Sequence, residues 1–123
     1  MIVRHYQELV VWQKAMDLVM LVYATTDSFP QREVFGLTNQ IRRAAVSIPS
    51  NIAEGQGRKS ARDFIRYLLI FNGSLQELET QVMVAARLNY MSPTQQVAIL
   101  DLSAEVGRLI NGLSKSLARE DRS

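Results

Sequence analysis

The residues with the clearest chemical potential are basic side chains that gather in one stretch of the chain. Between residues 42 and 66 there are six basic residues and two acidic ones, a net charge of +4. The basic residues are Arg42, Arg43, Arg58, Lys59, Arg62 and Arg66. The whole chain has 14 basic and 12 acidic residues, so the remainder carries a net charge of −2. A slightly acidic chain with one basic stretch favours an anionic partner at that stretch.

Part of this stretch, Gly55-Gln-Gly57-Arg-Lys-Ser60, is a glycine-rich turn that leads into a predicted helix. It lacks the spacing of a Walker A loop, and Ser60 stands where a dinucleotide fingerprint needs its third glycine. The free N–H groups at a helix start and the positive end of its dipole attract anions. Two interpretations stay open here: a phosphate or other anion site, and a plain connection between helices with solvated charges.

Arg42 and Arg43 flank the core stripe of the preceding helix. Arg43 shares a helical face with three mostly small polar residues, Ser47, Ser50 and Glu54. Exposed faces usually carry longer side chains, so this pattern indicates close packing against another helix or subunit. The two arginines either form interfacial ion pairs with acidic side chains or bind a partner. The candidate acids are Glu54, Glu77 and Glu79.

Several kinds of catalysis have no residues to support them. The chain has no cysteine and one histidine, His5, which excludes disulfides, thiolate nucleophiles and His-rich metal sites. Glu77 and Glu79 are two positions apart, so they lie on different faces of a helix and do not converge. There is no Glu-x-x-His pair of a di-iron bundle. We therefore predict a protein that is not an enzyme, with no catalytic residue, no metal and no cofactor.

The elements that position these residues are predicted to be helices throughout. Apolar residues recur at helical spacing, and no sustained alternation of period two occurs. We predict one all-α domain over 1–123, an antiparallel up-down-up-down four-helix bundle with helices at about 8–25, 34–54, 61–89 and 93–117. Pro49 predicts a kink in the second helix, with two helices broken at Ile48 as the alternative. Ser60 and Ser92 are predicted caps, and Gly55 and Gly57 are predicted to end the second helix.

The first predicted helix is apolar on almost all sides, which in a domain of this size indicates a second subunit. Helix 61–89, by contrast, has one regular core stripe and a small Gly73 that would allow a neighbour to approach closely. The interface residues that we predict are Val10, Val11, Trp12 and Met20 from the first helix and Ser47, Ser50 and Glu54 from the second.

Longer motifs resemble a known bacterial family. The chain is similar to the four-helix-bundle proteins encoded in intervening sequences of large-subunit ribosomal RNA genes, a family related to the accessory variability protein of diversity-generating retroelements. The resemblance covers about 9–115. It implies ring-shaped homopentamers, and the retroelement relatives bind nucleic acid and a reverse transcriptase. The motifs that carry it are Trp12-Gln-Lys-Ala15, Phe29-Pro30, Phe35-Gly-Leu37, Gln40-Ile-Arg-Arg-Ala44, Ser47-Ile-Pro-Ser-Asn-Ile-Ala-Glu-Gly55, Gly57-Arg58 and Gly73-Ser-Leu-Gln-Glu-Leu-Glu79.

These observations lead to one functional hypothesis and two alternatives. The first is a ring-forming, non-catalytic bundle that binds RNA or DNA backbone through the six basic residues. The second is a protein–protein scaffold whose arginines serve subunit contacts. A small-molecule-binding bundle is disfavoured, because large residues fill the core stripe of helix 61–89. The longest apolar run is seven residues and the first eight lack signal-peptide order, so we expect a cytoplasmic protein without a membrane partner.

Overall fold

The computed structural model describes residues 5–58 and 60–122, and within them it is helical with no strand. The all-α prediction is therefore confirmed for this part of the chain. The helices are α1 (His5–Glu8), α2 (Val10–Thr26), the 3-10 helix η1 (Gln31–Glu33), α3 (Leu37–Gln56), α4 (Ala61–Arg87) and α5 (Pro93–Arg122).

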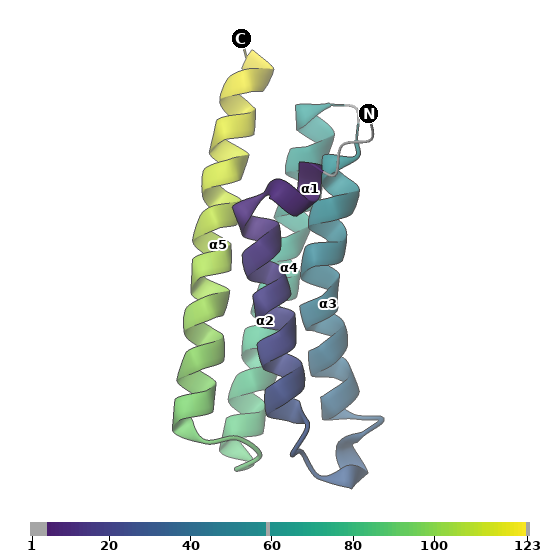
Figure 1. Ribbon diagram of the computed structural model, residues 1–123, viewed down its shortest axis with the longest axis vertical. Helices are drawn as coiled ribbons and strands as arrows, with labels where there is room; N and C mark the ends of the chain where they lie inside the picture. The colour runs from purple at the N-terminus through teal and green to yellow at the C-terminus, as the bar shows by residue number, and fades with distance from the viewer. Residues whose placement is uncertain (1–4, 59, 123) are drawn as a thin grey trace.

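The four long helices lie side by side, and helices that follow one another in the chain run in opposite directions (Figure 1). Contacts join α2 to α3, α3 to α4, α4 to α5, and α5 back to α2. The connections α2–α3 and α4–α5 lie at one end, which we call the loop end. The α3–α4 connection lies at the other end, with α1 and the end of α5, and we call it the turn end. The basic stretch, residues 42–66, therefore begins in the first half of α3, runs to the turn end and continues into α4.

The core follows the predicted stripes on α3 and α4. On α4 all seven residues of the predicted stripe are buried: Phe64, Leu68, Phe71, Leu75, Leu78, Val82 and Ala85. On α5 the buried line includes Ile99, Ser103, Val106 and Ile110, and four half-buried leucines flank it: Leu102, Leu109, Leu113 and Leu117. The hydroxyl of the buried Ser103 donates a 2.8 Å hydrogen bond to Glu79 of α4. A satisfied polar group tolerates burial, which the apolar pattern alone does not reveal.

The two serine caps are confirmed, but the first helix begins later than predicted. The Ser60 oxygen accepts the Asp63 N–H at 3.1 Å, and Ser92 and Gln95 bond each other reciprocally. At the chain start Leu9 is extended, with φ −73° and ψ 127°, and separates α1 from α2. This break allows the Tyr6 ring to pack edge-on against Trp12, with centroids 5.4 Å apart.

The end of α3 differs from the prediction in the role of its glycines. α3 ends at Gln56 and Gly57 follows it with φ −77°, so the left-handed conformation that glycine often adopts after a helix is not used here. Gly55 lies inside α3 and is buried, and a Cβ there would lie 2.8 Å from the Cβ of Tyr67 on α4. Its absent side chain therefore allows α3 and α4 to approach closely. Pro49 lies within one continuous helix, so the two-helix alternative is wrong, while the kink stays a prediction.

The loop end is held by a network around Glu33. Its two carboxylate oxygens accept the Tyr90 hydroxyl at 2.8 Å and the Leu37 N–H at 3.2 Å, so Glu33 caps α3 from the preceding turn. The Tyr90 hydrogen bond, with the Leu37 N–H, lowers the pKa of Glu33 below its usual value. A Cβ on Gly36 would lie 2.9 Å from the Glu33 carboxylate, so a glycine keeps this cap in place. Beside it Phe35 is 95% exposed.

Candidate functional site

The basic stretch of the sequence separates into two groups in space. Arg42 and Arg43 lie on the first half of α3, towards the loop end, whereas Arg58 follows α3 at the turn end. At a rise of 1.5 Å per residue, about 20 Å of helix separates Arg43 from Arg58. Lys59 lies outside the described residues. We call the first pair the seam arginines and Arg58, Arg62 and Arg66 the turn-end arginines.

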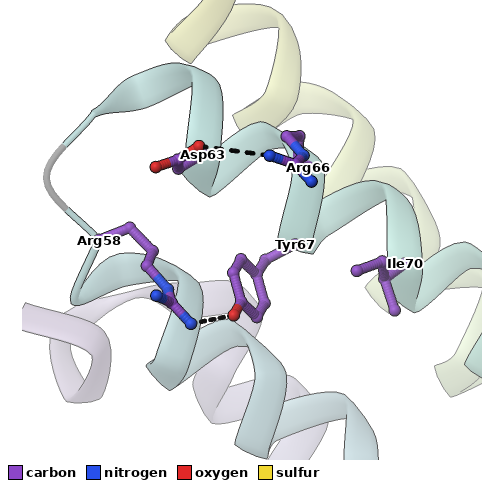
Figure 2. A pocket seen from close by; sticks show the side chains of 5 residues that line it. All are labelled: Arg58, Asp63, Arg66, Tyr67 and Ile70. Atoms are coloured by element: carbon purple, nitrogen blue, oxygen red, sulfur yellow. Dashed lines mark hydrogen bonds and ion pairs between the residues drawn. The ribbon is translucent and has the colours of Figure 1, made fainter.

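Among the turn-end arginines, Arg58 is engaged by its own chain. It donates to Glu54 at 3.1 Å and to the Tyr67 hydroxyl, and its guanidinium carbon lies 4.7 Å from the centroid of the Tyr67 ring. Figure 2 shows the hollow that this pair borders, with Asp63, Arg66 and Ile70 on its α4 side. Arg66 lies 3.7 Å from Asp63, with 76% of its side chain exposed. The hollow is therefore charged and open, with positive and negative groups on its walls.

The acids predicted as partners for Arg42 and Arg43 have other partners. Glu54 pairs with Arg58, Glu79 accepts from Ser103, and Glu77 accepts from Gln81 at 3.2 Å. Within the described part of the chain, the predicted ion pairs of the seam arginines are therefore not formed. Glu77 is exposed, so its carboxylate is accessible to an arginine of a second copy.

Arg42 is held in place by neutral groups. Its Nε donates to the Thr26 hydroxyl at 2.8 Å, and its guanidinium carbon lies 4.5 Å from the centroid of the Tyr23 ring. Neither interaction uses its two Nη groups, and Arg43 has no recorded partner in the described chain. Because the Arg42 guanidinium is held by its stacking contact while its two Nη groups are available, it is suited to bind a carboxylate or phosphate through two hydrogen bonds.

The seam arginines line one half of a groove between α2 and α3. Their half also contains Tyr23, Asn39, Val46 and Ser47. Val46 also lines the other half, which is mainly apolar and runs towards α1. That half is lined by Tyr6, Trp12, Met16, Val19, Val46, Pro49, Ser50 and Ala53. We call the whole groove the α2/α3 seam; it carries charge at one end and apolar surface at the other.

The predicted interface residues divide into exposed and buried ones. Val10 and Met20 are 56% and 65% exposed, and Ser50 and Glu54 are exposed on α3. Trp12 and Ser47 are half-buried. Val11 is 4% exposed and packs in the core of its own chain, so its place in an interface stays a prediction. The helical phase places Val11 beside Ala15 and Leu18, on the buried side of α2.

Three features of the surface were missed from the sequence. The first is Tyr67, which holds Arg58 although it lies nine residues further along the chain, across a turn. Gly55, which packs against Tyr67, was the residue in the sequence that could have indicated this contact. Phe35 is almost fully exposed in a motif that we used only for the resemblance. The third is a set of exposed apolar residues on α4 and at its end, which the strong core stripe concealed: Leu69, Ile70, Met83, Val84 and, directly after the helix, Leu88.

The described residues also bear on metal binding and on membrane insertion. Among the side chains described, no group of three or more His, Cys, Asp or Glu is placed to hold a metal ion. No helix in the described ranges is long and apolar enough to span a bilayer.

Comparisons with known proteins identify the family. No curated protein matches the chain. A solved structure from Bacteroides thetaiotaomicron, described as a protein of unknown function from the S23 ribosomal protein family, is 27% identical with a TM-score of 0.76. The similarity covers 86% of this chain and 99% of that one. The family described as 23S rRNA-intervening sequence protein matches residues 7–112. With this match over most of its length, the chain belongs to the 23S rRNA-intervening sequence protein family.

Proposed function

We propose that this protein is a non-catalytic helical bundle whose copies assemble into a ring, and that the ring binds RNA or DNA backbone through its arginines. The observation that carries the proposal is the amount of exposed apolar surface on the long helices. Val10, Met16, Met20 and Tyr23 are exposed on α2, and Leu69, Ile70, Met83 and Val84 are exposed on α4. Large apolar patches on a protein surface mark sites of association.

The position of these surfaces favours a ring over a symmetric pair. α2 and α4 lie across the bundle from each other, because each contacts α3 and α5 and they do not contact one another. The α2/α3 seam and the exposed side of α4 are therefore two different surfaces, and they adjoin at the groove that Arg43 and Glu77 border. Joining two different surfaces is a head-to-tail contact, which closes into a ring when the rotation allows it. The resemblance noted from the sequence favours closure with five copies.

The turn-end arginines support binding of nucleic acid. Arg58, Arg62 and Arg66 lie around the start of α4, where the helix dipole adds positive potential. A ring repeats this group once per copy and thereby multiplies the local charge. Contacts of arginine to phosphate give affinity without sequence readout, and that affinity falls steeply with salt.

The test is light scattering on a sizing column, with and without a short structured RNA, at two salt concentrations. We expect a mass of several times 13.9 kDa and RNA binding at low salt that is lost at high salt. The triple variant Arg58→Glu, Arg62→Glu, Arg66→Glu should abolish the binding, while Arg108→Glu, an exposed arginine on α5, should not. RNA binding that is absent at low salt, or unchanged in the triple variant, contradicts the proposal.

A second candidate function is a protein–protein scaffold, and one observation favours it. Arg58 is already paired with Glu54 and Tyr67, which reduces what it can offer a phosphate. A scaffold would assemble equally well but would show no salt-dependent RNA binding. The relation to retroelement proteins, the absence of catalysis and the cytoplasmic location stay predictions.

A further inference from the structure

We propose that the α2/α3 seam receives α4 of a second copy, with Glu77 of that copy between Arg42 and Arg43. The inference rests on the proposed assembly and names the residues that make its contact. It assigns the seam arginines to a protein carboxylate, and it leaves the turn-end arginines for nucleic acid.

The seam has the chemistry of a site for a helix that carries one carboxylate beside apolar side chains. The Arg42 fork is fixed by Thr26 and Tyr23, so binding a carboxylate orders little that is not ordered already. Next along the groove, Trp12 and Val46 provide apolar surface. RNA backbone would satisfy the arginines but would leave the apolar half facing a charged polymer, which favours a protein occupant.

The outward face of α4 has matching chemistry. Glu77 is exposed, and Ile70 and Val84, both exposed and apolar, lie seven residues before and after it. Seven residues of helix span about 10.5 Å. On the seam, a similar length of α3, about 10 Å, separates Arg43 from Ser50 in the apolar half. An ion pair at the arginines therefore brings an apolar residue of α4 over the apolar half.

Gly73 gives independent support from the same face. It is exposed in the interior of α4, and a Cβ built on it would meet nothing within 4 Å. A glycine in a helix interior costs roughly 1 kcal/mol relative to alanine, and nothing within the described chain requires it. Gly112 on α5 has the same open surroundings, so what distinguishes Gly73 is its place on the face of α4 that carries Glu77 and Ile70, where it leaves room for the backbone of a second copy.

The experiment uses charge reversal between copies. Arg43→Glu alone and Glu77→Arg alone each place like charges at the contact, so each should weaken assembly about tenfold or more. Mixed together, the two variants restore opposite charges at every contact between unlike copies. Light scattering of the mixture should therefore show a higher mass than either variant shows alone. In a ring of five, one contact still joins like copies, so the expected result is association above the level of the single variants and not the full wild-type assembly. The mixing step is essential because Arg43 and Glu77 also border one groove within a chain, and mixing does not repair an intrachain effect.

A steric variant tests the same contact without charge. Gly73→Leu should fold, since its side chain meets open space within the chain, and should assemble poorly. Gly112→Leu is the matched control, because Gly112 is also an exposed helical glycine with no atom within 4 Å of a built Cβ. It should fold and assemble like the wild type, and circular dichroism monitors folding in every variant.

The outcomes are distinguishable. Dissociation of each single variant with recovery on mixing supports the seam–α4 contact. A wild type that assembles while Arg43→Glu and Gly73→Leu assemble equally well overturns this contact and leaves the proposed ring intact. Dissociation of the single variants without recovery on mixing overturns the Arg43–Glu77 pairing. A wild type that is monomeric at all concentrations overturns both the contact and the ring.

Discussion

Arg42 and Arg58 each stack on a tyrosine, at 4.5 and 4.7 Å, but they differ in what binds the rest of the guanidinium. Arg58 donates to the carboxylate of Glu54, so its charge is compensated within the chain. Arg42 donates to a neutral hydroxyl, beside a groove that becomes apolar one turn further along α3. Two arginines of one basic stretch therefore occupy different electrostatic settings, and the partner of each is a better guide to its role than the local charge count.

The largest expected effect concerns the close approach of α3 and α4 that supports the Arg58 site. In Gly55→Val the new side chain meets Tyr67 and Phe64, and we expect a loss of about 2–3 kcal/mol in the free energy of unfolding. Urea denaturation measures it. Gly112→Ala, where a Cβ has space, should gain roughly 0.5–1 kcal/mol. Equal stability of Gly55→Val and the wild type would contradict the assigned role of Gly55.

The next effect separates the two arginine groups by their response to salt. Arg66→Glu should lower RNA affinity and reduce the slope of log affinity against log salt by at least about 0.7–0.9, the contribution of one lost phosphate contact. Arg66→Gln removes the positive charge without adding a negative one, so it should change the slope less than Arg66→Glu does. Arg43→Gln, in the seam group, should leave the slope unchanged when it is measured at protein concentrations that keep the ring assembled. Equal slopes for Arg66→Glu and the wild type would remove Arg66 from the nucleic-acid surface.

A smaller effect tests whether the tyrosine under Arg42 serves assembly. Tyr23→Leu removes the stacking surface but keeps apolar bulk, and a cation–π contact of this kind contributes about 0.5–1 kcal/mol. We therefore expect assembly to weaken about two- to fivefold with RNA affinity per copy unchanged. Tyr67→Leu should show the reverse pattern, because Tyr67 holds Arg58. Identical behaviour of the two variants would erase the distinction between the groups.

The smallest effect concerns Glu33 at the loop end, which belongs to neither group of arginines. The pKa of Glu33 is lowered in the folded chain by the Tyr90 hydroxyl, so its ionised form stabilises the fold. That contribution is complete above the usual glutamate pKa of 4.5 and is lost as the pH falls through the lowered value. Thermal unfolding should therefore show a smaller loss on acidification in Glu33→Gln than in the wild type. Parallel pH profiles would contradict the role of Glu33 as a cap.

The sequence predicted what depends on regular spacing. The α4 stripe from Phe64 to Ala85 and the Ser60 cap follow from helical periodicity and local hydrogen bonding, and both are confirmed. What it missed depends on contacts between helices. The Glu79–Ser103 bond buries a serine within an apolar stripe, and the one-sided burial of α2 encloses Val11 although its neighbour Val10 is exposed.

The candidate site divides along the same line. The residue types of the basic stretch were visible in the sequence, but their separation into two groups is a consequence of the length of α3. The pairing of Arg58 with Tyr67 requires α4 to return beside α3, and no pattern within either helix encodes that register. The exposed apolar residues of α4 were not predicted, because the core stripe alone accounted for the helical pattern of that segment.

Sedimentation equilibrium of the wild type and of Gly73→Leu over a range of concentrations tests the central claim most directly, that identical copies associate through different faces of the bundle. We expect a mass several times 13.9 kDa for the wild type and a mass that falls towards 13.9 kDa on dilution for Gly73→Leu. A wild-type mass of 13.9 kDa at every concentration would contradict the account.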